Sequence, residues 1–341
     1  MFRQSLQLLK QSSRNNNSTR LSTQQLAMKL LYPTSIKLNL EEQLKGQPVT
    51  VVPYDPSKTF PDEHADADAM VTWMNTPENL KDAVSRLTKL RWIQSLAAGP
   101  NDVLSAGFDK SKVTVTSGSG LHNLPVAEHA LGLLLAAARR FHEMRDYQVE
   151  KKWAGHLRGD PTIPSYMFST LRNANILIWG YGNIAKALTP YLTGLGAKVR
   201  GIARNEGVRD GVEVFTEDKL PTLLPETDAL VMILPGSDST KHALNAEKLK
   251  YLREHAWVIN VGRGTSLDEE AIVNSLTKGE IGGAALDVFE QEPLPASSPL
   301  WTAPNLILSP HAAGNRPLGS EILIEENLKH LLAGEPLKNV M

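Results

Sequence analysis

The chain has 341 residues, which exceeds the usual size of one hydrophobic core, so two domains are expected. Its hydrophobic content of 41% is ordinary for a folded globular protein, and a net charge of −1 without a basic stripe argues against nucleic acid as a partner. The sequence contains no cysteine, which excludes disulfides, thiolate nucleophiles and cysteine-ligated zinc, and no metal site is predicted. No apolar run reaches the roughly 18 residues that a membrane-spanning helix needs, so no membrane partner is expected.

The segment before Met28 differs in composition from the rest of the chain. It contains no Asp or Glu, yet it carries several Lys and Arg residues and many Ser and Thr residues. Phe2, Leu6 and Leu9 would share one helical face, and a cationic amphipathic start of this kind is typical of a mitochondrial transit peptide. A disordered tail without a targeting role explains the same composition equally well. Residues 1–28 are therefore predicted to be an N-terminal extension, with a mitochondrial location, or a cytoplasmic one if synthesis starts at Met28.

From Lys29 onward the sequence alternates short apolar runs with amphipathic stretches. The helical period is clear over 78–90, where Pro77 suits the first helical position. Alternation of this kind predicts parallel strands joined by crossover helices. The expected strands of this first series are 29–32, 49–52, 69–73, 92–96 and 113–116.

A long apolar segment, 125–144, has Pro125 in its first turn and is expected to be one helix that connects two domains. The polar stretch 147–173 is expected to be an arm or loop. A second alternating series follows, and the segment 317–332 is predicted to be a helix that returns to the first domain. The expected strands of the second series are 175–179, 198–203, 229–234, 257–261, 283–288 and 306–310, with a helix at 269–276.

A glycine-rich turn follows the first strand of the second series. Gly180 permits the tight turn, Gly182 lets a pyrophosphate approach the backbone, and Ala185 keeps the next helix close to the strand. The N-terminus of that helix offers unpaired N–H groups to phosphates. An ordinary turn that contains glycine is the alternative, but the position between a strand and a helix favours a dinucleotide site. The residues predicted to form this site are Gly180, Tyr181, Gly182, Asn183, Ile184 and Ala185.

The end of the next strand bears on the choice of cofactor. Ala203 stands where an NAD-dependent enzyme usually carries the carboxylate that binds the ribose hydroxyls, and Arg204 follows it. A guanidinium suits the 2′-phosphate of NADP, and the missing carboxylate removes the charge that would repel that phosphate. Arg209 is a second cation available to share the phosphate, whereas a solvated Arg204 is the alternative. The sequence therefore predicts NADP(H) as the cofactor and leaves NAD(H) open.

Three ionisable residues fall at carboxyl ends of strands in the second series, where ligands of open α/β sheets bind. Arg263 has the planar fork of donors that binds a carboxylate and polarises an oxo group. His311 can protonate a developing alkoxide near neutral pH, and Glu292 can stabilise and orient its imidazolium. Singly, each residue also fits a structural ion pair, a loop charge or a turn cap. Together they favour reduction of a 2-oxo acid, whereas His129 is expected to be a packed residue of the connector helix.

Four segments resemble the signatures of the D-isomer-specific 2-hydroxy acid dehydrogenases, the group to which glyoxylate and hydroxypyruvate reductases belong. The likeness covers roughly residues 29–332 and implies an α/β fold of two doubly wound parallel-sheet domains. A Rossmann nucleotide-binding domain would be inserted into a flavodoxin-like substrate domain, with a cleft between them. The segments are IWGYGNIA (178–185), VINVGRG (258–264), GAALDVFEQEP (283–293) and SPHAAG (309–314). The implied bounds are 29–124 with 315–341 for the substrate-binding domain and 125–314 for the NAD(P)-binding domain with its connector helix.

The resemblance also implies roles for individual residues. Arg263, Glu292 and His311 correspond to the family's catalytic residues, and Ala98 and Gly99 to the substrate loop whose backbone N–H groups receive the carboxylate. Further residues are expected at the cofactor or the pocket: Asp287 at the nicotinamide carboxamide, Leu234, Pro235 and Val261 beside the cofactor, and Trp73 and Met74 at the substrate, where a core role is an equal alternative.

These observations predict an oxidoreductase that uses NADPH to reduce a small 2-oxo acid. The resemblance implies that the product is the D-2-hydroxy acid and that the protein forms a homodimer. Glyoxylate and hydroxypyruvate are the simplest substrates, and bulkier 2-oxo acids stay open. The chain departs from the family pattern at Ala185, at Ala203 with Arg204, and in its N-terminal extension. Glu292 argues against formate dehydrogenases of the same architecture, which carry Gln in place of the proton-transfer partner. A dinucleotide-sensing co-repressor of the same superfamily is the alternative function, since its members keep the same three residues.

Overall fold

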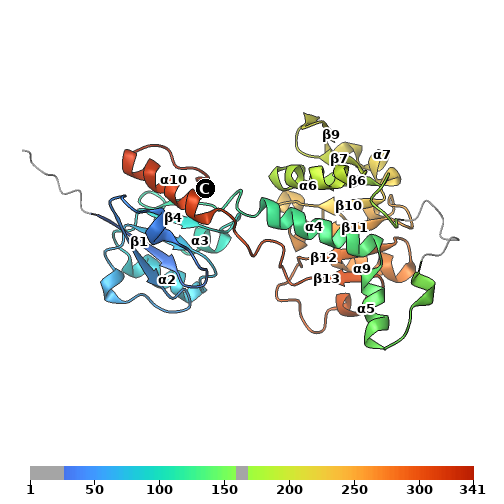
Figure 1. The fold of residues 1–341 in the computed structure, drawn as a ribbon, viewed down its shortest axis with the longest axis horizontal. Coiled ribbons are helices and arrows are strands. Elements are labelled where there is room, and N and C mark those ends of the chain that lie inside the picture. The colour runs from blue at the N-terminus through green and yellow to red at the C-terminus, as the bar shows by residue number, and fades with distance from the viewer. Residues whose placement is uncertain (1–26, 159–167) are drawn as a thin grey trace, which may run out of the picture.

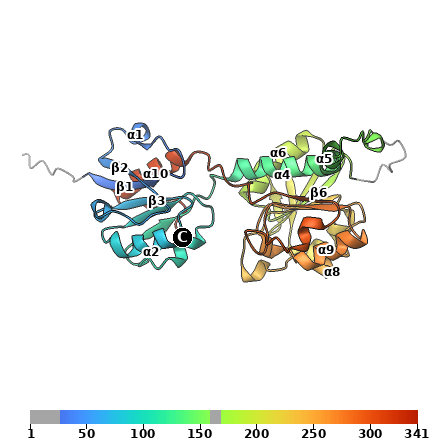
Figure 2. The same cartoon turned by 90° about the horizontal axis from the view of Figure 1, so that it is seen from below.

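The computed structural model describes residues 27–158 and 168–341, which form two lobes along the long axis of the molecule (Figure 1; Figure 2). The predictions made for the targeting segment 1–26 lie outside the described residues. Among the helices of the described residues, none is both long and apolar enough to cross a membrane.

The first lobe is built on a five-stranded parallel sheet with the order β2-β1-β3-β4-β5. This order, which changes direction beside β1, is the doubly wound arrangement of flavodoxin-like proteins. Its helix α2 begins as the sequence predicts, because the Thr76 side chain caps the N–H of Asn79 and Pro77 takes the first helical position. The strands are β1 Met28–Pro33, β2 Val49–Tyr54, β3 Ala69–Thr72, β4 Trp92–Ser95 and β5 Thr114–Thr116, and the helices are α1 Leu40–Gln43, α2 Pro77–Arg86 and α3 Asn101–Ser105.

The second lobe contains an eight-stranded sheet with the order β13-β12-β11-β10-β6-β7-β9-β8. All of its pairings are parallel except the one between β8 and β9, a hairpin that the sequence analysis did not predict. Core side chains cover both faces of the sheet, and helices lie on both sides of it (Figure 2). The strands are β6 Asn175–Trp179, β7 Lys198–Ile202, β8 Gly207–Arg209, β9 Val212–Phe215, β10 Ala229–Met232, β11 Trp257–Asn260, β12 Gly283–Leu286 and β13 Leu306–Leu308. The helices are α6 Asn183–Gly194, α7 Leu220–Leu223, α8 Ala246–Leu249 and α9 Glu269–Lys278.

The connector between the lobes consists of two helices, α4 Asn123–Ala138 and α5 Phe141–Val149, so the prediction of one helix over 125–144 was wrong. The break occurs at Arg140, whose φ of 54° is left-handed and cannot continue a right-handed helix. The Arg140 guanidinium then donates to both carboxylate oxygens of Glu143, which stabilises the start of α5. Helix α4 packs with α6 in the core of the second lobe.

The C-terminal helix α10, Ser320–Ala333, returns to the first lobe as the sequence predicts (Figure 1). Leu323, Ile324 and Leu328 are buried against the first sheet. The amide of Asn327 is also buried and donates to Gln94 Oε1 at 2.7 Å. The first lobe is therefore assembled from both ends of the described chain. His311 and Asn315 lie on the segment that precedes α10 and line the cavity between the lobes.

Candidate active site

The turn after β6 leaves room for a pyrophosphate. Gly180 has a φ of +103°, and a Cβ there would lie 2.4 Å from the carbonyl oxygen of Ile233, so only glycine fits. A Cβ on Gly182 would meet no atom within 4 Å, which leaves open space in front of the N-terminus of α6. Ala185 is fully buried between helix and sheet. A phosphate can therefore approach the unpaired N–H groups of the first turn of α6.

The side chain of Tyr181 has a structural role that the sequence did not reveal. The ring of Tyr181 points inward, is 2% exposed, and lies where a Cβ on Gly201 would come within 2.5 Å of it. Its hydroxyl lies 2.9 Å from Thr189 Oγ1 on α6. Only the backbone of Tyr181 therefore faces the turn. Ile184, by contrast, lines the cavity between the lobes, and Asn183 is exposed at the helix start.

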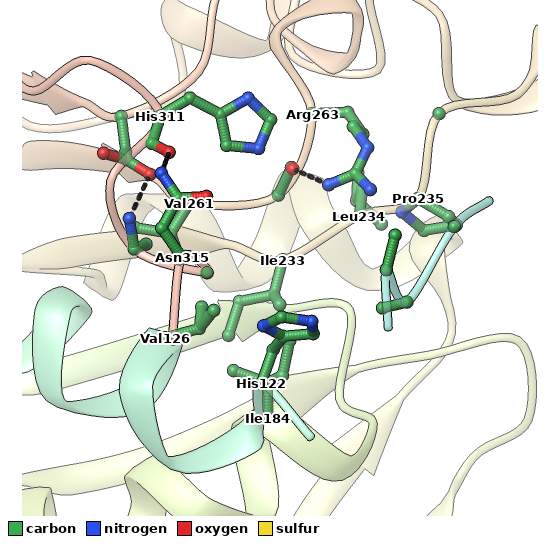
Figure 3. Close-up of a pocket in the computed structure, with 18 of the residues that line it drawn as sticks. His122, Val126, Ile184, Ile233, Leu234, Pro235, Val261, Arg263, His311 and Asn315 are labelled. Atoms are coloured by element: carbon green, nitrogen blue, oxygen red, sulfur yellow. Dashed lines mark hydrogen bonds between the residues drawn. The ribbon is translucent and has the colours of Figure 1, made fainter. Parts of the chain in front are cut away.

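The predicted acid–base pair is formed in the structure. His311 Nδ1 donates to Glu292 Oε2 at 2.6 Å, and the other Glu292 oxygen accepts from the Phe289 N–H at 2.9 Å. The backbone of His311 is left-handed, with φ of 50°, and its N–H donates to the Asp287 carbonyl at 2.7 Å. With Nδ1 engaged by the carboxylate, Nε2 is the ring nitrogen left for a ligand, and the ring points toward Arg263 across the cavity (Figure 3).

Arg263 lines the cavity between the two lobes. Its Nη1 donates to the carbonyl of Gly262 at 2.8 Å, which fixes the plane of the guanidinium (Figure 3). A Cβ on Gly99, in the substrate loop of the first lobe, would lie 3.4 Å from Nη2. Asn260, fully buried, accepts from the Gly262 N–H and donates to the Arg263 carbonyl, so the loop that carries Arg263 is rigidly held. The guanidinium thus faces the backbone of the Gly99 loop, and both are predicted to bind the carboxylate of the substrate.

Asp287 is completely buried, and its carboxylate ties β12 to the segment that carries His311. It accepts from the Ser309 hydroxyl at 2.6 Å and from the N–H groups of Ala312 and Ala313 at 2.9 and 3.0 Å. Burial alone would raise the pKa of Asp287, but His129, at 3.3 Å, and these three donors outweigh it and hold the pKa below its usual value. Within the described parts of the chain Oδ2 accepts a hydrogen bond from Ala313 alone, so one of its lone pairs is available to a carboxamide.

His129 was expected to be an ordinary packed residue of the connector, and the structure corrects that expectation. Its Nε2 lies 2.9 Å from the Ser309 hydroxyl and 3.3 Å from Asp287 Oδ1, within the hydrogen-bond cluster of the site. The sequence carries no local signal for the contact between His129 and Asp287, because these residues are 158 positions apart and meet only through the packing of α4.

A cavity of about 570 Å³ lies between the lobes and collects most of the predicted residues (Figure 3). The predicted residues that line it are Trp73, Ala98, Gly99, Ile184, Leu234, Pro235, Val261, Arg263, Asp287 and His311. Glu292 stands behind His311, and Met74 is 67% exposed outside the lining. Polar lining residues that the sequence did not predict include Asn101, Asn315 and His122, whose ring stacks on Trp73 with centroids 5.7 Å apart. In the described parts of the chain, no group of three or more His, Cys, Asp or Glu is arranged to hold a metal ion.

A doubly wound sheet with a phosphate-binding turn, joined to an arginine and an imidazole–carboxylate pair at its strand ends, defines a dinucleotide-dependent dehydrogenase. The chain belongs to the D-isomer specific 2-hydroxyacid dehydrogenase family, whose NAD binding domain matches residues 131–313.

Known proteins of similar sequence and structure agree with this assignment. The glyoxylate reductase of Korarchaeum cryptofilum is 32% identical over 255 residues, which cover 73% of this chain and 74% of that protein. A D-isomer specific 2-hydroxyacid dehydrogenase family protein from Aeromonas salmonicida superposes with a TM-score of 0.79 at 28% identity, covering 92% of this chain and 99% of its own. An NADPH-dependent glyoxylate/hydroxypyruvate reductase from Sinorhizobium meliloti, in complex with NADP and sulfate, gives 0.74 at 26% identity, with 92% and 98% covered.

Proposed function

We propose that the protein reduces a small 2-oxo acid to the D-2-hydroxy acid and that NADPH is its preferred cofactor. The observation that carries this proposal is the meeting of three groups at one cavity. The Arg263 guanidinium faces the Gly99 loop, and the His311 ring points toward Arg263. Glu292 accepts a hydrogen bond from Nδ1 of this ring. These groups match the carboxylate, the oxo oxygen and the proton requirement of the reaction.

Each side chain then has a distinct task. The N–H groups of Ala98 and Gly99 and the guanidinium of Arg263 bind the substrate carboxylate, and Arg263 also polarises the oxo group. His311 delivers a proton to the oxo oxygen, and Glu292 stabilises the imidazolium before that transfer. When bound, the dinucleotide supplies the hydride that adds to carbon 2. The pyrophosphate would be held by the turn at Gly182, and the carboxamide by Asp287.

The cavity and the names of similar proteins support the proposed substrate class. The cavity must hold both the nicotinamide end of the cofactor and the oxo acid, so its volume of about 570 Å³ favours a small acid. Similar proteins are named glyoxylate reductase and glyoxylate/hydroxypyruvate reductase. Glyoxylate and hydroxypyruvate are therefore the substrates that we propose.

We also propose the domain limits 29–124 with 315–341 for substrate binding and 125–314 for the dinucleotide, and a homodimer. The separate cores of the two lobes and the return of α10 support the limits. Exposed apolar side chains on and after α5, namely Phe141, Val149 and Trp153, support self-association.

Purified protein should be assayed with a panel of 2-oxo acids, each with NADPH and with NADH. We expect the highest kcat/KM for glyoxylate or hydroxypyruvate and a product of D configuration. Turnover only of large aromatic or branched 2-oxo acids would contradict the substrate proposal, and an L product would contradict the stereochemical one.

A pair of substitutions tests the proposed preference for NADPH. In the parent, Ala203 offers no carboxylate that would repel the 2′-phosphate. The double change Ala203→Asp with Arg204→Leu adds that carboxylate and removes a cation. We expect an NADPH preference of at least about tenfold in kcat/KM in the parent and a reversed order in the variant. Because Arg204 is exposed, solvent screens its contact with a phosphate, and equal use of both cofactors by the parent would refute the assignment.

A further inference from the structure

The hairpin of β8 and β9 brings an additional cation to the dinucleotide site. Strand β9 lies beside β7 (Figure 1) and pairs with its end in parallel, Gly201 with Val214 and Ile202 with Phe215, and β8 forms the edge of the sheet. The N–H of Ala203 continues this pairing by donating to the Phe215 carbonyl at 2.9 Å. The hairpin therefore follows the loop after β7, where the adenosine ribose lies in doubly wound proteins.

Arg209, at the end of β8, is fixed over this loop by two hydrogen bonds. Its Nη1 donates to the carbonyl of Tyr181 at 2.7 Å, and its Nη2 donates to the carbonyl of Asn205 at 2.8 Å. Tyr181 belongs to the glycine-rich turn and Asn205 to the loop after β7, so the guanidinium links the two segments between which the ribose of a dinucleotide would lie. The turn and β7 are themselves tied, because the N–H groups of Gly180 and Tyr181 both donate to the Ile202 carbonyl.

No carboxylate of the described residues forms an ion pair with Arg209, so its positive charge can bind an anion. Its neighbour Asp210 pairs with Lys186 on α6 at 3.1 Å, so the carboxylate is compensated and the tip of the hairpin is attached to the nucleotide-binding helix. Two of its five guanidinium N–H groups donate to the carbonyls of Tyr181 and Asn205. The other three N–H groups are available to donate to a ligand. Arg204, by comparison, is exposed and must lose more side-chain freedom when it binds.

We propose that Arg209 is the principal ligand of the 2′-phosphate of NADPH and that Arg204 is secondary. This inference rests on the proposed use of NADPH. A guanidinium already held in place by two carbonyls loses little conformational freedom on binding, and its remaining donors match phosphate oxygens. Of the two cations, Arg209 on the hairpin then contributes more to the binding of the 2′-phosphate than Arg204, while Ala203 contributes by leaving out the carboxylate that would repel this phosphate.

The test compares Kd values for NADPH, NADH, 2′,5′-ADP and 5′-AMP in Arg209→Gln, Arg209→Lys and Arg204→Gln. Arg209→Gln should weaken NADPH and 2′,5′-ADP by about 10- to 100-fold and change NADH and 5′-AMP by less than about threefold. Arg209→Lys keeps the charge without the fork and should fall between the parent and Arg209→Gln. Arg204→Gln should have the smaller effect. Arg200→Gln is the matched control, because Arg200 lies on β7 but pairs with Glu226 at 2.9 Å, and both cofactors should bind it as they bind the parent.

Two results would overturn the inference while the proposed function stands. Equal weakening of NADPH and NADH in the Arg209 variants would show that Arg209 only supports the turn. A parent that prefers NADPH, with selectivity lost in Arg204→Gln and kept in Arg209→Gln, would give the phosphate to Arg204. A parent without NADPH preference is the different result that refutes the proposed cofactor itself. If Arg209→Gln does not fold, the Lys variant decides, since unchanged selectivity there contradicts the role of the fork.

Discussion

The chemistry at the scale of single residues depends on the 2.6 Å hydrogen bond between His311 and Glu292. Replacing His311 by Ala removes the proton donor, so we expect kcat for reduction to fall by about 10²- to 10⁴-fold while the Kd of the cofactor stays unchanged. His242 offers a matched control, because it also pairs with a glutamate, Glu290, at 3.0 Å but does not line the cavity. His242→Ala should keep kcat within about threefold of the parent, and a His311→Ala enzyme of similar activity would rule out the proposed acid.

Arg263 tests the other half of the site, the recognition of the carboxylate. Arg263→Lys keeps a positive charge but loses the bond of Nη1 to the Gly262 carbonyl and the second donor near Gly99. We expect both a higher KM and a lower kcat for the oxo acid, because the fork acts on the carboxylate and on the oxo group together. Steady-state kinetics measure both values. A Lys variant with parental constants would mean that Arg263 does not contact the substrate.

Among the secondary-structure elements, the carboxylate of Asp287 holds β12 to the segment that contains His311 by accepting hydrogen bonds from Ser309, Ala312 and Ala313. Asp287→Asn removes one acceptor from donors that are buried, and we expect the free energy of unfolding at neutral pH to fall by about 1–3 kcal/mol. Since the pKa of Asp287 is lowered by folding, its stabilisation is present above the unfolded pKa of about 3.9 and disappears as the pH falls through the folded value.

Urea unfolding at several pH values measures this effect. The difference between parent and Asp287→Asn should be full near pH 7 and should shrink below about pH 4. A difference that is the same at both pH values would show that the charge of Asp287 contributes nothing to stability.

The sequence predicted most strands because their buried runs are apolar, as in Ala229–Met232, where all four side chains are buried. It also located Arg263 and His311, because the carboxyl ends of parallel strands meet at one edge. The hairpin strand Gly207–Arg209 escaped prediction, since it is short and mostly exposed and so has no apolar period. The helix break at Arg140 carries no Gly or Pro signal, and contacts such as that of His129 with Asp287 depend on packing between distant segments.

On the scale of the whole molecule, the fold of the described residues begins with β1 at Met28, a residue that is 2% exposed. Deleting residues 1–27 leaves this strand and every residue of the cavity intact. We therefore expect the shortened chain to keep its Tm within about 2 °C and its kcat within about twofold, as measured by thermal unfolding and turnover. Loss of folding would show that the removed segment is part of the structure, whereas import of a reporter fused to it would support the targeting role.

The proposed reduction is tested by following the oxidation of NADPH when the parent and His311→Ala are each mixed with glyoxylate or hydroxypyruvate. We expect steady consumption of NADPH by the parent, formation of the D-2-hydroxy acid where the product is chiral, and loss of at least about 99% of the rate in the variant. Tight binding of NADPH by the parent without turnover of any 2-oxo acid would contradict the proposed reductase function and favour a protein that senses the dinucleotide. Equal rates in parent and variant would contradict it as well.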